Sequence, residues 1–463
     1  MKKFVLATSF ILLAACSQSQ SVDETSNLVT YERGQTNMGM IEWVDAQAKL
    51  GHEIAFENPM DTMAADFVKL ALRLGQIDGD YVDAYHGPKI WKERADNTAV
   101  DKVTLASDIA LFQTQLSALE VAEKHKIRKQ QLLKLSRAMG VRLAVLSGEK
   151  VSFDQEVSEI YDVVPPQYDL SYYDAVLAKI DAMLPGEGTT AERVTAFTNR
   201  FAIPKAQLKP IFDRAIEECK LRTQRYFDLP ATENFRMEFV SDKSWSGYNY
   251  YQGNYESLIQ INTDFPITID RAVDLGCHEG YPGHHVWNLF IEKELVRNRG
   301  WIEYSVNPLF GPFGPLAEGT GNYGIELAFP GDEKITFERE VLFPMADLDP
   351  ETAESLAKLK ALTGQLSHAS NEVSRRYLDG KISQEDAVQL MQKYYLQSRE
   401  KTEQRLRFVQ KYRAYVINYN IGKDIAASYV KSAGDSRDAQ WAAFRDMLTI
   451  PLTPGDIQVQ SKP

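Results

Sequence analysis

The sequence predicts a mainly α-helical protein with a small antiparallel sheet, and two observations support this fold class. Apolar residues recur at three- and four-residue spacing over long stretches (61–74, 100–147 and 170–226), which is typical of amphipathic helices. Segments 236–240 and 257–262 are instead short, rich in Val, Ile, Leu and Phe, and flank an aromatic stretch with several turn residues. We therefore expect two or three antiparallel strands inserted among long helices.

The first 36 residues differ in composition from the rest of the chain. Lys2 and Lys3 precede an apolar run that is too short to span a bilayer, which is the pattern of a signal peptide. The run ends in Leu13-Ala14-Ala15-Cys16, which resembles the lipobox of bacterial lipoproteins. We predict a lipoprotein signal peptide at 1–15, lipidation of Cys16, a flexible tether at 16–36 rich in Ser, Gln and Asn, and one large domain at 37–463 with room for two helical lobes around a cleft.

The sequence also indicates where the protein is located and which partners it has. Ser17, directly after the lipobox cysteine, fits sorting to the outer membrane by resemblance to known lipoproteins. The predicted location is therefore the bacterial cell envelope, with the domain anchored through the lipid on Cys16 and facing the periplasm. A net charge of −12 without a basic run argues against nucleic acid as a partner.

Two cysteines remain after Cys16. In an oxidising envelope Cys219 and Cys277 could pair. Both fall in predicted helices, and Cys277 stands next to a candidate metal ligand. We therefore expect two buried thiols rather than a disulfide.

One stretch, residues 277–285, carries the chemistry. Its sequence is CHEGYPGHH, so that three of the seven histidines lie within eight residues and Glu279 follows the first of them. Neutral imidazole is the commonest metal ligand, and a neighbouring carboxylate can act as a general base. The stretch therefore predicts a metal site, with one zinc ion serving hydrolysis.

Pro282 determines how the second ligand is placed. In an unbroken helix His285 would return to the face of His278, and His284 would point roughly 120° away. Pro282 lacks an N–H, so a regular helix cannot continue through it. We therefore favour His284 as the second ligand and keep His285 as the alternative, with the other histidine orienting a ligand or the substrate.

The third ligand should come from a separate element, because a catalytic zinc commonly takes three protein ligands and leaves one position for water. Glu318 lies forty residues after His278, one turn into a helix that Pro315 can begin. We favour Glu318, with Glu326 as the alternative on the same face.

The expected mechanism is metal-assisted hydrolysis. Glu279 would accept a proton from water activated by the metal, and a phenol or cation would stabilise the oxyanion. Tyr419 is our preferred candidate for that second role, and Tyr415, Tyr323 and Arg413 are alternatives.

The pattern His278-Glu279-x-x-Pro282-Gly283-His284-His285, followed by Glu318-Gly319 and Tyr419-x-Ile421-Gly422, resembles the bacterial domain-of-unknown-function family eight-eight-five. Members of that family are often lipoproteins and are grouped with the gluzincin-like zinc metallopeptidases. The resemblance implies a mainly helical, metallopeptidase-like fold. It also implies that His278, His284 and Glu318 bind zinc and that Glu279 is the base.

The sequence thus predicts an envelope-anchored zinc metallopeptidase whose substrate is a peptide or another small amide. Two alternatives stay open. One is a non-peptidase metal hydrolase that acts on envelope material. The other is a non-catalytic binding or scaffolding lipoprotein that has kept the fold, although a binding module has no need of Glu279.

Overall fold

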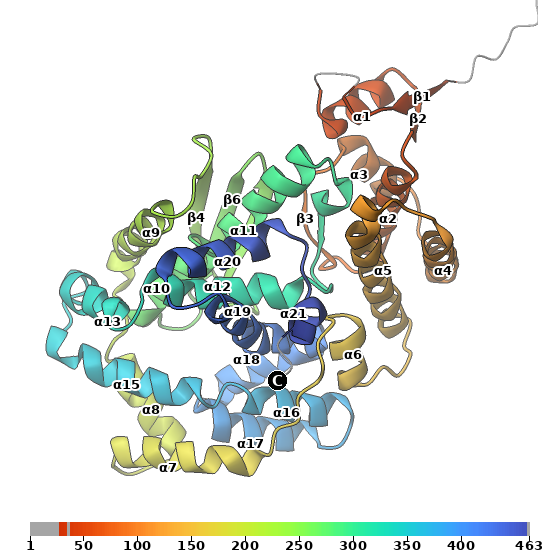
Figure 1. Cartoon of the computed structure of the whole chain (residues 1–463). Helices are drawn as coiled ribbons and strands as arrows, with labels where there is room; N and C mark the ends of the chain where they lie inside the picture. The colour runs from red at the N-terminus through yellow and green to blue at the C-terminus, as the bar shows by residue number, and fades with distance from the viewer. Residues whose placement is uncertain (1–26, 35–37, 461–463) are drawn as a thin grey trace, which may run out of the picture.

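The structure, a computed structural model, describes residues 27–34 and 38–460 and is mainly α-helical, as the sequence predicts. Figure 1 shows the helices surrounding a small sheet. The α-helices are α1 (Met40–Lys49), α2 (Pro59–Ile77), α3 (Lys89–Asp96), α4 (Lys102–Ala118), α5 (Lys126–Leu146), α6 (Phe153–Glu159), α7 (Asp174–Met183), α8 (Thr190–Asn199), α9 (Leu208–Gln224), α10 (Asp270–Glu279), α11 (His284–Phe290), α12 (Gly314–Ala328), α13 (Glu333–Phe337), α14 (Phe343–Met345), α15 (Ala353–Gly364), α16 (Ala369–Leu378), α17 (Gln384–Tyr395), α18 (Arg399–Tyr412), α19 (Ile421–Ser432), α20 (Arg437–Thr449) and α21 (Pro454–Gln460). Between α18 and α19 lies the 3-10 segment η8 (Arg413–Tyr419).

The strands form three small sheets. They are β1 (Leu28–Tyr31), β2 (Glu53–Phe56), β3 (Val82–Tyr85), β4 (Asn234–Val240), β5 (Gly247–Gly253), β6 (Glu256–Asn262) and β7 (Val306–Pro308). β1 pairs with β2 in parallel, and β3 pairs with β7 antiparallel. The third sheet has the order β4-β6-β5 and lies beside α10, which carries His278 and Glu279.

The prediction of an antiparallel sheet is wrong for one of its two pairings. β5 and β6 form an antiparallel hairpin, whose two turn residues Asn254 and Tyr255 have φ values of 54° and 64°. These are the left-handed conformations that a tight hairpin turn requires. β4, however, runs parallel to β6. β4 and β5 form the two edges of this sheet, and β6 lies between them, antiparallel to β5. The aromatic stretch between the two predicted strands contains β5, so the region has three strands, within the two or three that we expected.

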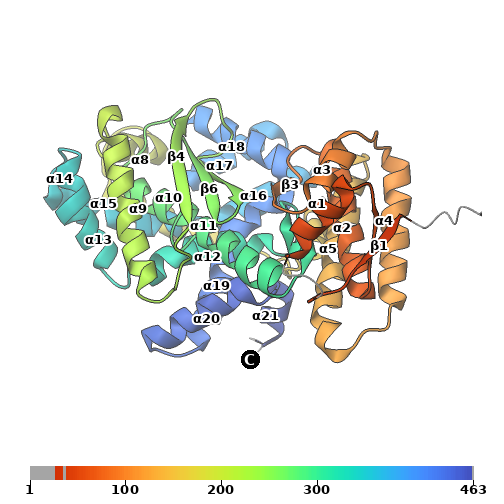
Figure 2. The same cartoon turned by 90° about the horizontal axis from the view of Figure 1, so that it is seen from above.

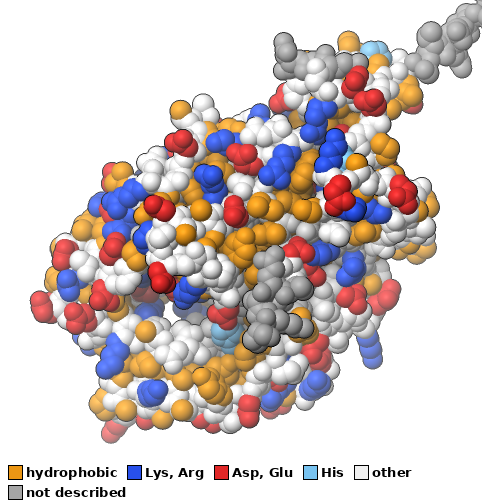
Figure 3. All heavy atoms as spheres, in the orientation of Figure 1, with side chains coloured by type: hydrophobic (Ala, Val, Ile, Leu, Met, Phe, Trp, Pro, Cys, Tyr) orange, Lys and Arg blue, Asp and Glu red, His pale blue; other side chains and the backbone are white. Residues whose placement is uncertain are grey.

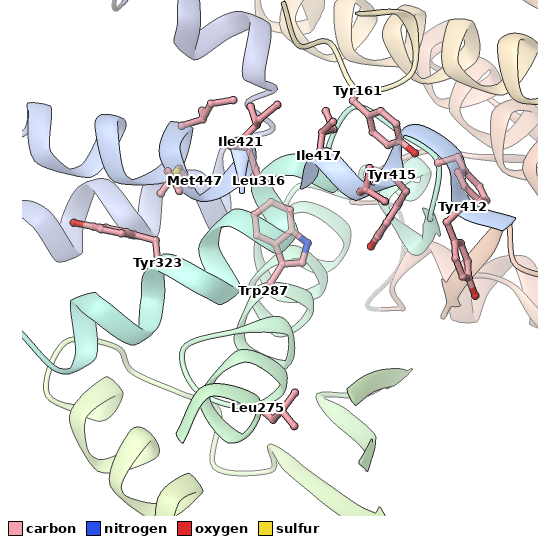
Figure 4. Close-up of a cluster of buried hydrophobic side chains, with 14 of the residues drawn as sticks. Tyr161, Leu275, Trp287, Leu316, Tyr323, Tyr412, Tyr415, Ile417, Ile421 and Met447 are labelled. Carbon is pink, nitrogen blue, oxygen red and sulfur yellow. The ribbon is translucent and has the colours of Figure 1, made fainter. Parts of the chain in front are cut away.

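The N-terminal helices α1–α5 gather at one end of the molecule, and the remaining helices pack around the three-stranded sheet and α10–α12 (Figure 2). Most buried hydrophobic side chains nevertheless belong to one core, which extends from Tyr31 to Ile457, and Leu295, Val296 and Tyr304 form a small separate cluster. Figure 4 shows its part near α12, where Leu275 of α10, Trp287 of α11, Leu316 and Tyr323 of α12, Tyr415 and Ile417 of η8, Ile421 of α19 and Met447 of α20 lie together.

The expectation of two free thiols is also wrong, because Cys219 and Cys277 form a disulfide. Their Cα atoms lie 5.7 Å apart, within the range that a disulfide spans. α9 and α10 pack side by side, so that one position on each helix faces the other. The bond therefore ties the helix of His278 and Glu279 to α9.

The N-terminal predictions fall mostly outside the described residues. The signal peptide at 1–15 and the lipidated Cys16 are among these, and so is most of the tether at 16–36. Residues 28–31 of the predicted tether form β1, so this part is a strand paired with β2. None of the described helices is long and apolar enough to cross a membrane.

Candidate metal centre

The helix is interrupted around Pro282, as the sequence predicts. α10 ends at Glu279, and α11 begins at His284. The N–H of Gly283 donates to the carbonyl of Cys277 at 3.1 Å. A Cβ on Gly283 would collide with the carbonyl of His278, so a residue without a side chain is needed at this turn. The break turns the second helix, so that His284 faces back toward His278.

Three side chains converge at this turn: His278 at the end of α10, His284 at the start of α11 and Glu318 from α12. Their ligand atoms all lie within 4.8 Å of one another, and the two imidazole rings have centroids 4.6 Å apart. α12 can approach because it carries Gly321, where a Cβ would lie only 2.8 Å from His278 Nδ1. The small residues around Glu318 thus let its helix pack directly against the histidine.

These three residues fit a bound cation. Glu318 Oε2 lies 3.1 Å from His278 Nε2 and 3.6 Å from His284 Nε2. It is nevertheless a buried oxygen that makes no hydrogen bond with the described residues. The three ligand atoms therefore lie close enough together to share one ion. Two imidazole nitrogens and one carboxylate oxygen are a donor set that suits zinc.

The charges within the cluster are strongly coupled. Burial lowers the pKa of His284, but the Glu318 carboxylate outweighs burial and raises that pKa to about 9. Burial likewise raises the pKa of Glu318, but His284 and His278 outweigh it and hold that pKa far below its usual range. The cluster therefore favours a positive charge at its centre, and a metal ion would take the place of the proton on the histidine.

Glu279 lies beside the cluster without belonging to it. Its side chain is buried, and its Oε2 has no hydrogen-bond partner in the described chain. Burial raises the pKa of Glu279, although His278 and His284 pull it downward. Gly247 of β5 packs so close that a Cβ there would lie 2.8 Å from Glu279 Oε1. This is a carboxylate with a free oxygen and raised basicity.

The alternative ligands do not reach the cluster. His285 is fully buried on the other side of α11, where Ser257 and Glu233 lie 2.8 and 2.9 Å from its two ring nitrogens. Glu326 is exposed and pairs with Lys423 at 2.6 Å. Among the residues weighed as ligands, the structure thus brings together His278, His284 and Glu318.

The four candidates for oxyanion stabilisation differ in their distance from the cluster and in their partners. The Tyr415 hydroxyl donates to Glu318 Oε1 at 2.6 Å, and the ring of Tyr419 lies 5.8 Å from that of Tyr415. Tyr419 and Tyr323 line the cavity described below. Arg413 points elsewhere and pairs with Glu156 at 2.5 Å. Tyr415 therefore contacts a candidate ligand, Tyr419 lines the cavity beside it, and Arg413 is paired away from the cluster.

Sequence reasoning missed Asp83, on β3. Tyr248 of β5 donates a hydrogen bond to its carboxylate, and Asn307 Nδ2 donates a second at 3.1 Å. Burial raises the pKa of Asp83 to about 6, although the Tyr248 hydrogen bond lowers it. Its charge acts on His284, so it belongs to the surroundings of the cluster. No motif around Asp83 in the sequence indicates this role.

The three candidate ligands, Glu279 and Asp83 line a cavity of about 1390 Å³. Residues of β5, α10, α12, α15, α18 and α19 line it. Figure 3 shows this face of the molecule hollowed between the regions of α13 and α15. The volume exceeds that of an ordinary small-molecule pocket, so there is room for an extended ligand.

Comparison with known proteins leaves the family open. No family model matches the chain, and no curated protein matches it. Among solved structures, a protein of Colwellia psychrerythraea inferred to be a lipoprotein aligns at a TM-score of 0.49 and 15% identity, over 76% of this chain and 65% of that one. The chain thus spans less than two thirds of that protein's length.

Two further structures align over more of their own length. One, from Shewanella oneidensis, is inferred to be a lipoprotein of unknown function and aligns at a TM-score of 0.42 and 12% identity, over 80% of this chain and 74% of that one. The M32 carboxypeptidase of Deinococcus radiodurans R1 aligns at 0.41 and 13% identity, over 84% and 88%. With every TM-score below 0.5, the function has to be argued from the site itself.

Proposed function

We propose that this chain is a zinc-dependent peptidase anchored to the bacterial envelope through a lipid on Cys16. One observation carries the proposal. His278, His284 and Glu318 bring three ligand atoms close enough together to share one ion, and Glu279 presents an unbonded carboxylate oxygen beside them. In a purely structural ion pair the buried carboxylate oxygens would be hydrogen-bonded, because buried polar groups are normally paired.

The roles follow from the contacts. His278, His284 and Glu318 hold the zinc ion, and Tyr415 fixes the orientation of Glu318 by its hydrogen bond to Oε1. The ion, when bound, activates water and polarises a substrate carbonyl.

Glu279 accepts the proton of the attacking water and passes it to the leaving amine, for which its raised pKa is suited. Tyr419, which lines the cavity next to Tyr415, donates to the oxyanion.

A peptide is the substrate that the cavity favours. Within the described chain β5 is an edge strand, paired with β6 alone, and residues 246–249 line the cavity next to Glu279. An extended peptide can add to such an edge by main-chain hydrogen bonds. This observation favours a peptidase over a hydrolase of other envelope material.

The experiment uses the full-length protein in detergent. We expect one zinc per chain by mass spectrometry, hydrolysis of a peptide library, loss of that hydrolysis with a chelator and recovery on addition of zinc. A protein without stoichiometric metal would point to the binding-module alternative. A zinc protein that cleaves amides or esters but no peptide would point to the non-peptidase hydrolase.

The lipid anchor has its own test. Full-length protein should fractionate with membranes and incorporate labelled fatty acid, and Cys16→Ser should abolish both. Unchanged membrane fractionation of the Cys16→Ser variant would contradict the anchor without touching the proposed chemistry.

A further inference from the structure

One wall of the cavity carries two cations that no carboxylate neutralises. Lys401 and Arg405 lie one helical turn apart on α18 and both line the cavity. Within residues 27–34 and 38–460, neither forms an ion pair with an Asp or Glu. A partly buried positive charge without a counter-ion is costly, so a binding role is its usual justification.

Arg405 is held by aromatic rings instead of by an acid. Its guanidinium carbon lies 5.0 Å from the ring centroid of Phe408, 5.6 Å from that of Tyr395 and 5.9 Å from that of Tyr419. Its Nε is buried and makes no hydrogen bond with a described residue. Stacking on rings fixes the plane of the guanidinium while leaving its fork of N–H donors unused.

Most of the other cations of the cavity are paired with carboxylates. Arg271, Lys334, Lys360 and Lys423 pair with Asp274, Glu338, Asp270 and Glu326 respectively. Arg437 and Lys431 have no carboxylate partner among the described residues, but both contact α12: Arg437 donates to the carbonyl of Leu327, and Lys431 lies over the ring of Tyr323.

The balance of charge in the cavity is also unusual for this chain. Apart from Asp83, Glu279 and Glu318 at the candidate metal centre, eight Lys and Arg but five Asp and Glu line the cavity. The chain as a whole carries a net charge of −12. With those three carboxylates included, the cavity lining has as many basic as acidic residues, so it repels anions less than the acidic chain as a whole does.

Arg405 is connected to the candidate metal centre through two phenols. It lies next to Tyr419, whose ring contacts that of Tyr415, and Tyr415 donates to Glu318. An anion on Arg405 would therefore lie in the same cavity as Glu279 and the three candidate ligands. The planar, forked guanidinium matches a carboxylate, which it can bind through two parallel hydrogen bonds.

We propose that Arg405, assisted by Lys401, binds a carboxylate of the substrate and so positions the bond to be cleaved near His278, His284 and Glu318. The proposal rests on the proposed function and narrows it to acidic substrates. The carboxylate is either the free C-terminus of a peptide or an acidic side chain, and both sources present the same chemistry to the guanidinium.

Binding tests the subsite separately from catalysis. Zinc-loaded, full-length Glu279→Gln protein is titrated calorimetrically with three N-acetylated tripeptides. These are a neutral peptide with a free carboxylate, its C-terminal amide, and an amide with one Asp side chain. We expect at least one of the two acids to bind about 10- to 100-fold more tightly than the neutral amide, because a charged hydrogen bond is lost in the amide.

Matched variants locate that preference. Arg405→Gln, added to the same protein, should bring the acids and the neutral amide to within about twofold, and Arg405→Lys should give an intermediate ratio. Arg407→Gln is the control: it removes the same charge from the same helix at an exposed position that does not line the cavity. It should keep the full preference. Zinc content and the melting temperature, measured for every variant, identify a protein that has merely misfolded.

Each outcome of these titrations either supports or overturns the carboxylate subsite. A preference that survives Arg405→Gln in folded protein, or equal binding of all three peptides, overturns the subsite. Tight binding of the free-carboxylate peptide alone assigns the C-terminus, and tight binding of the Asp amide alone assigns a side chain. If the preference is present but the wild-type protein hydrolyses no peptide, the subsite stands and the proposed function fails.

Discussion

Two histidine–carboxylate clusters lie back to back at α11, and they are built from the same residue types. His284, His278 and Glu318 form the candidate metal centre on one side. On the other side, His285 and Glu233 form a second cluster, which we call the His285 network, together with Tyr281, Ser257 and Lys220. Neighbours in the sequence thus serve two opposite faces.

The two clusters differ in how well their atoms are satisfied. In the His285 network, Glu233 accepts from Tyr281 at 2.5 Å, pairs with Lys220 at 2.5 Å and contacts His285 at 2.9 Å. At the candidate metal centre, Glu318 Oε2 and Glu279 Oε2 are buried without a hydrogen bond to a described residue. A saturated cluster stabilises the fold, whereas unsatisfied buried oxygens indicate a site that a ligand or reactant completes.

The largest expected effect is a loss of peptide hydrolysis on replacement of Glu279. Glu279→Gln should lower peptide hydrolysis about 10²- to 10⁴-fold, because the general base is lost, and should leave zinc content and stability almost unchanged. Steady-state kinetics and metal analysis measure both. Glu326→Gln, which changes an exposed surface pair, serves as the control. Full activity of Glu279→Gln would remove the proposed mechanism.

Replacing the adjacent histidines should give opposite results. His284→Ala should lose stoichiometric zinc and keep the fold, because it removes one of three ligands. His285→Ala should keep zinc but lower the free energy of unfolding by about 1–3 kcal/mol, because Glu233 and Ser257 each lose a buried partner. Denaturant unfolding and metal analysis of both variants test this. Exchanged phenotypes would mean that the two clusters have been assigned the wrong way round.

Acid titration of the His285 network should lower the free energy of unfolding. Burial raises the pKa of Glu233, but hydrogen bonds from His285, Lys220 and Tyr281 outweigh it and lower the pKa to about 2. The native state therefore binds fewer protons than the unfolded state between about pH 4.5 and 2.

The resulting stability, about 3 kcal/mol at most, is present above pH 4.5 and is lost as the pH falls through this window. Unfolding measured from pH 6 to 2 should show this loss, and Glu233→Gln should flatten the curve. An unchanged slope in that variant would contradict the assignment.

The smallest expected effect concerns Tyr415, whose hydroxyl donates a short hydrogen bond to Glu318. Tyr415→Phe should weaken zinc binding or activity about 10- to 100-fold, as is typical when the group that orients a ligand is lost. Competition with a metal-sensitive dye measures the affinity. Tyr412→Phe, whose ring lies 6.1 Å from that of Tyr415, is the matched control and should bind zinc normally.

Much of the local structure could be predicted from the sequence. The 3.6-residue periodicity identified the long helices, Pro282 predicted the break between His278 and His284, and Pro315 predicted the start of the helix that carries Glu318. These features depend on neighbours in the chain, so short-range rules suffice.

Pairings between distant segments could not be predicted. The Cys219–Cys277 disulfide depends on how α9 packs against α10, and the parallel β4–β6 pairing depends on where β5 lies. Asp83 joins the surroundings of the candidate metal centre from almost two hundred residues before His278. No local pattern encodes these contacts, because burial and packing decide them.

The sequence by itself determined that this chain carries His, Glu and Pro residues able to build a metal centre at a helix break. Only the tertiary structure decided between His284 and His285 and between Glu318 and Glu326, because the choice depends on which face of α11 and α12 turns toward α10. It also placed Arg405 in the same cavity, which no spacing in the sequence could show.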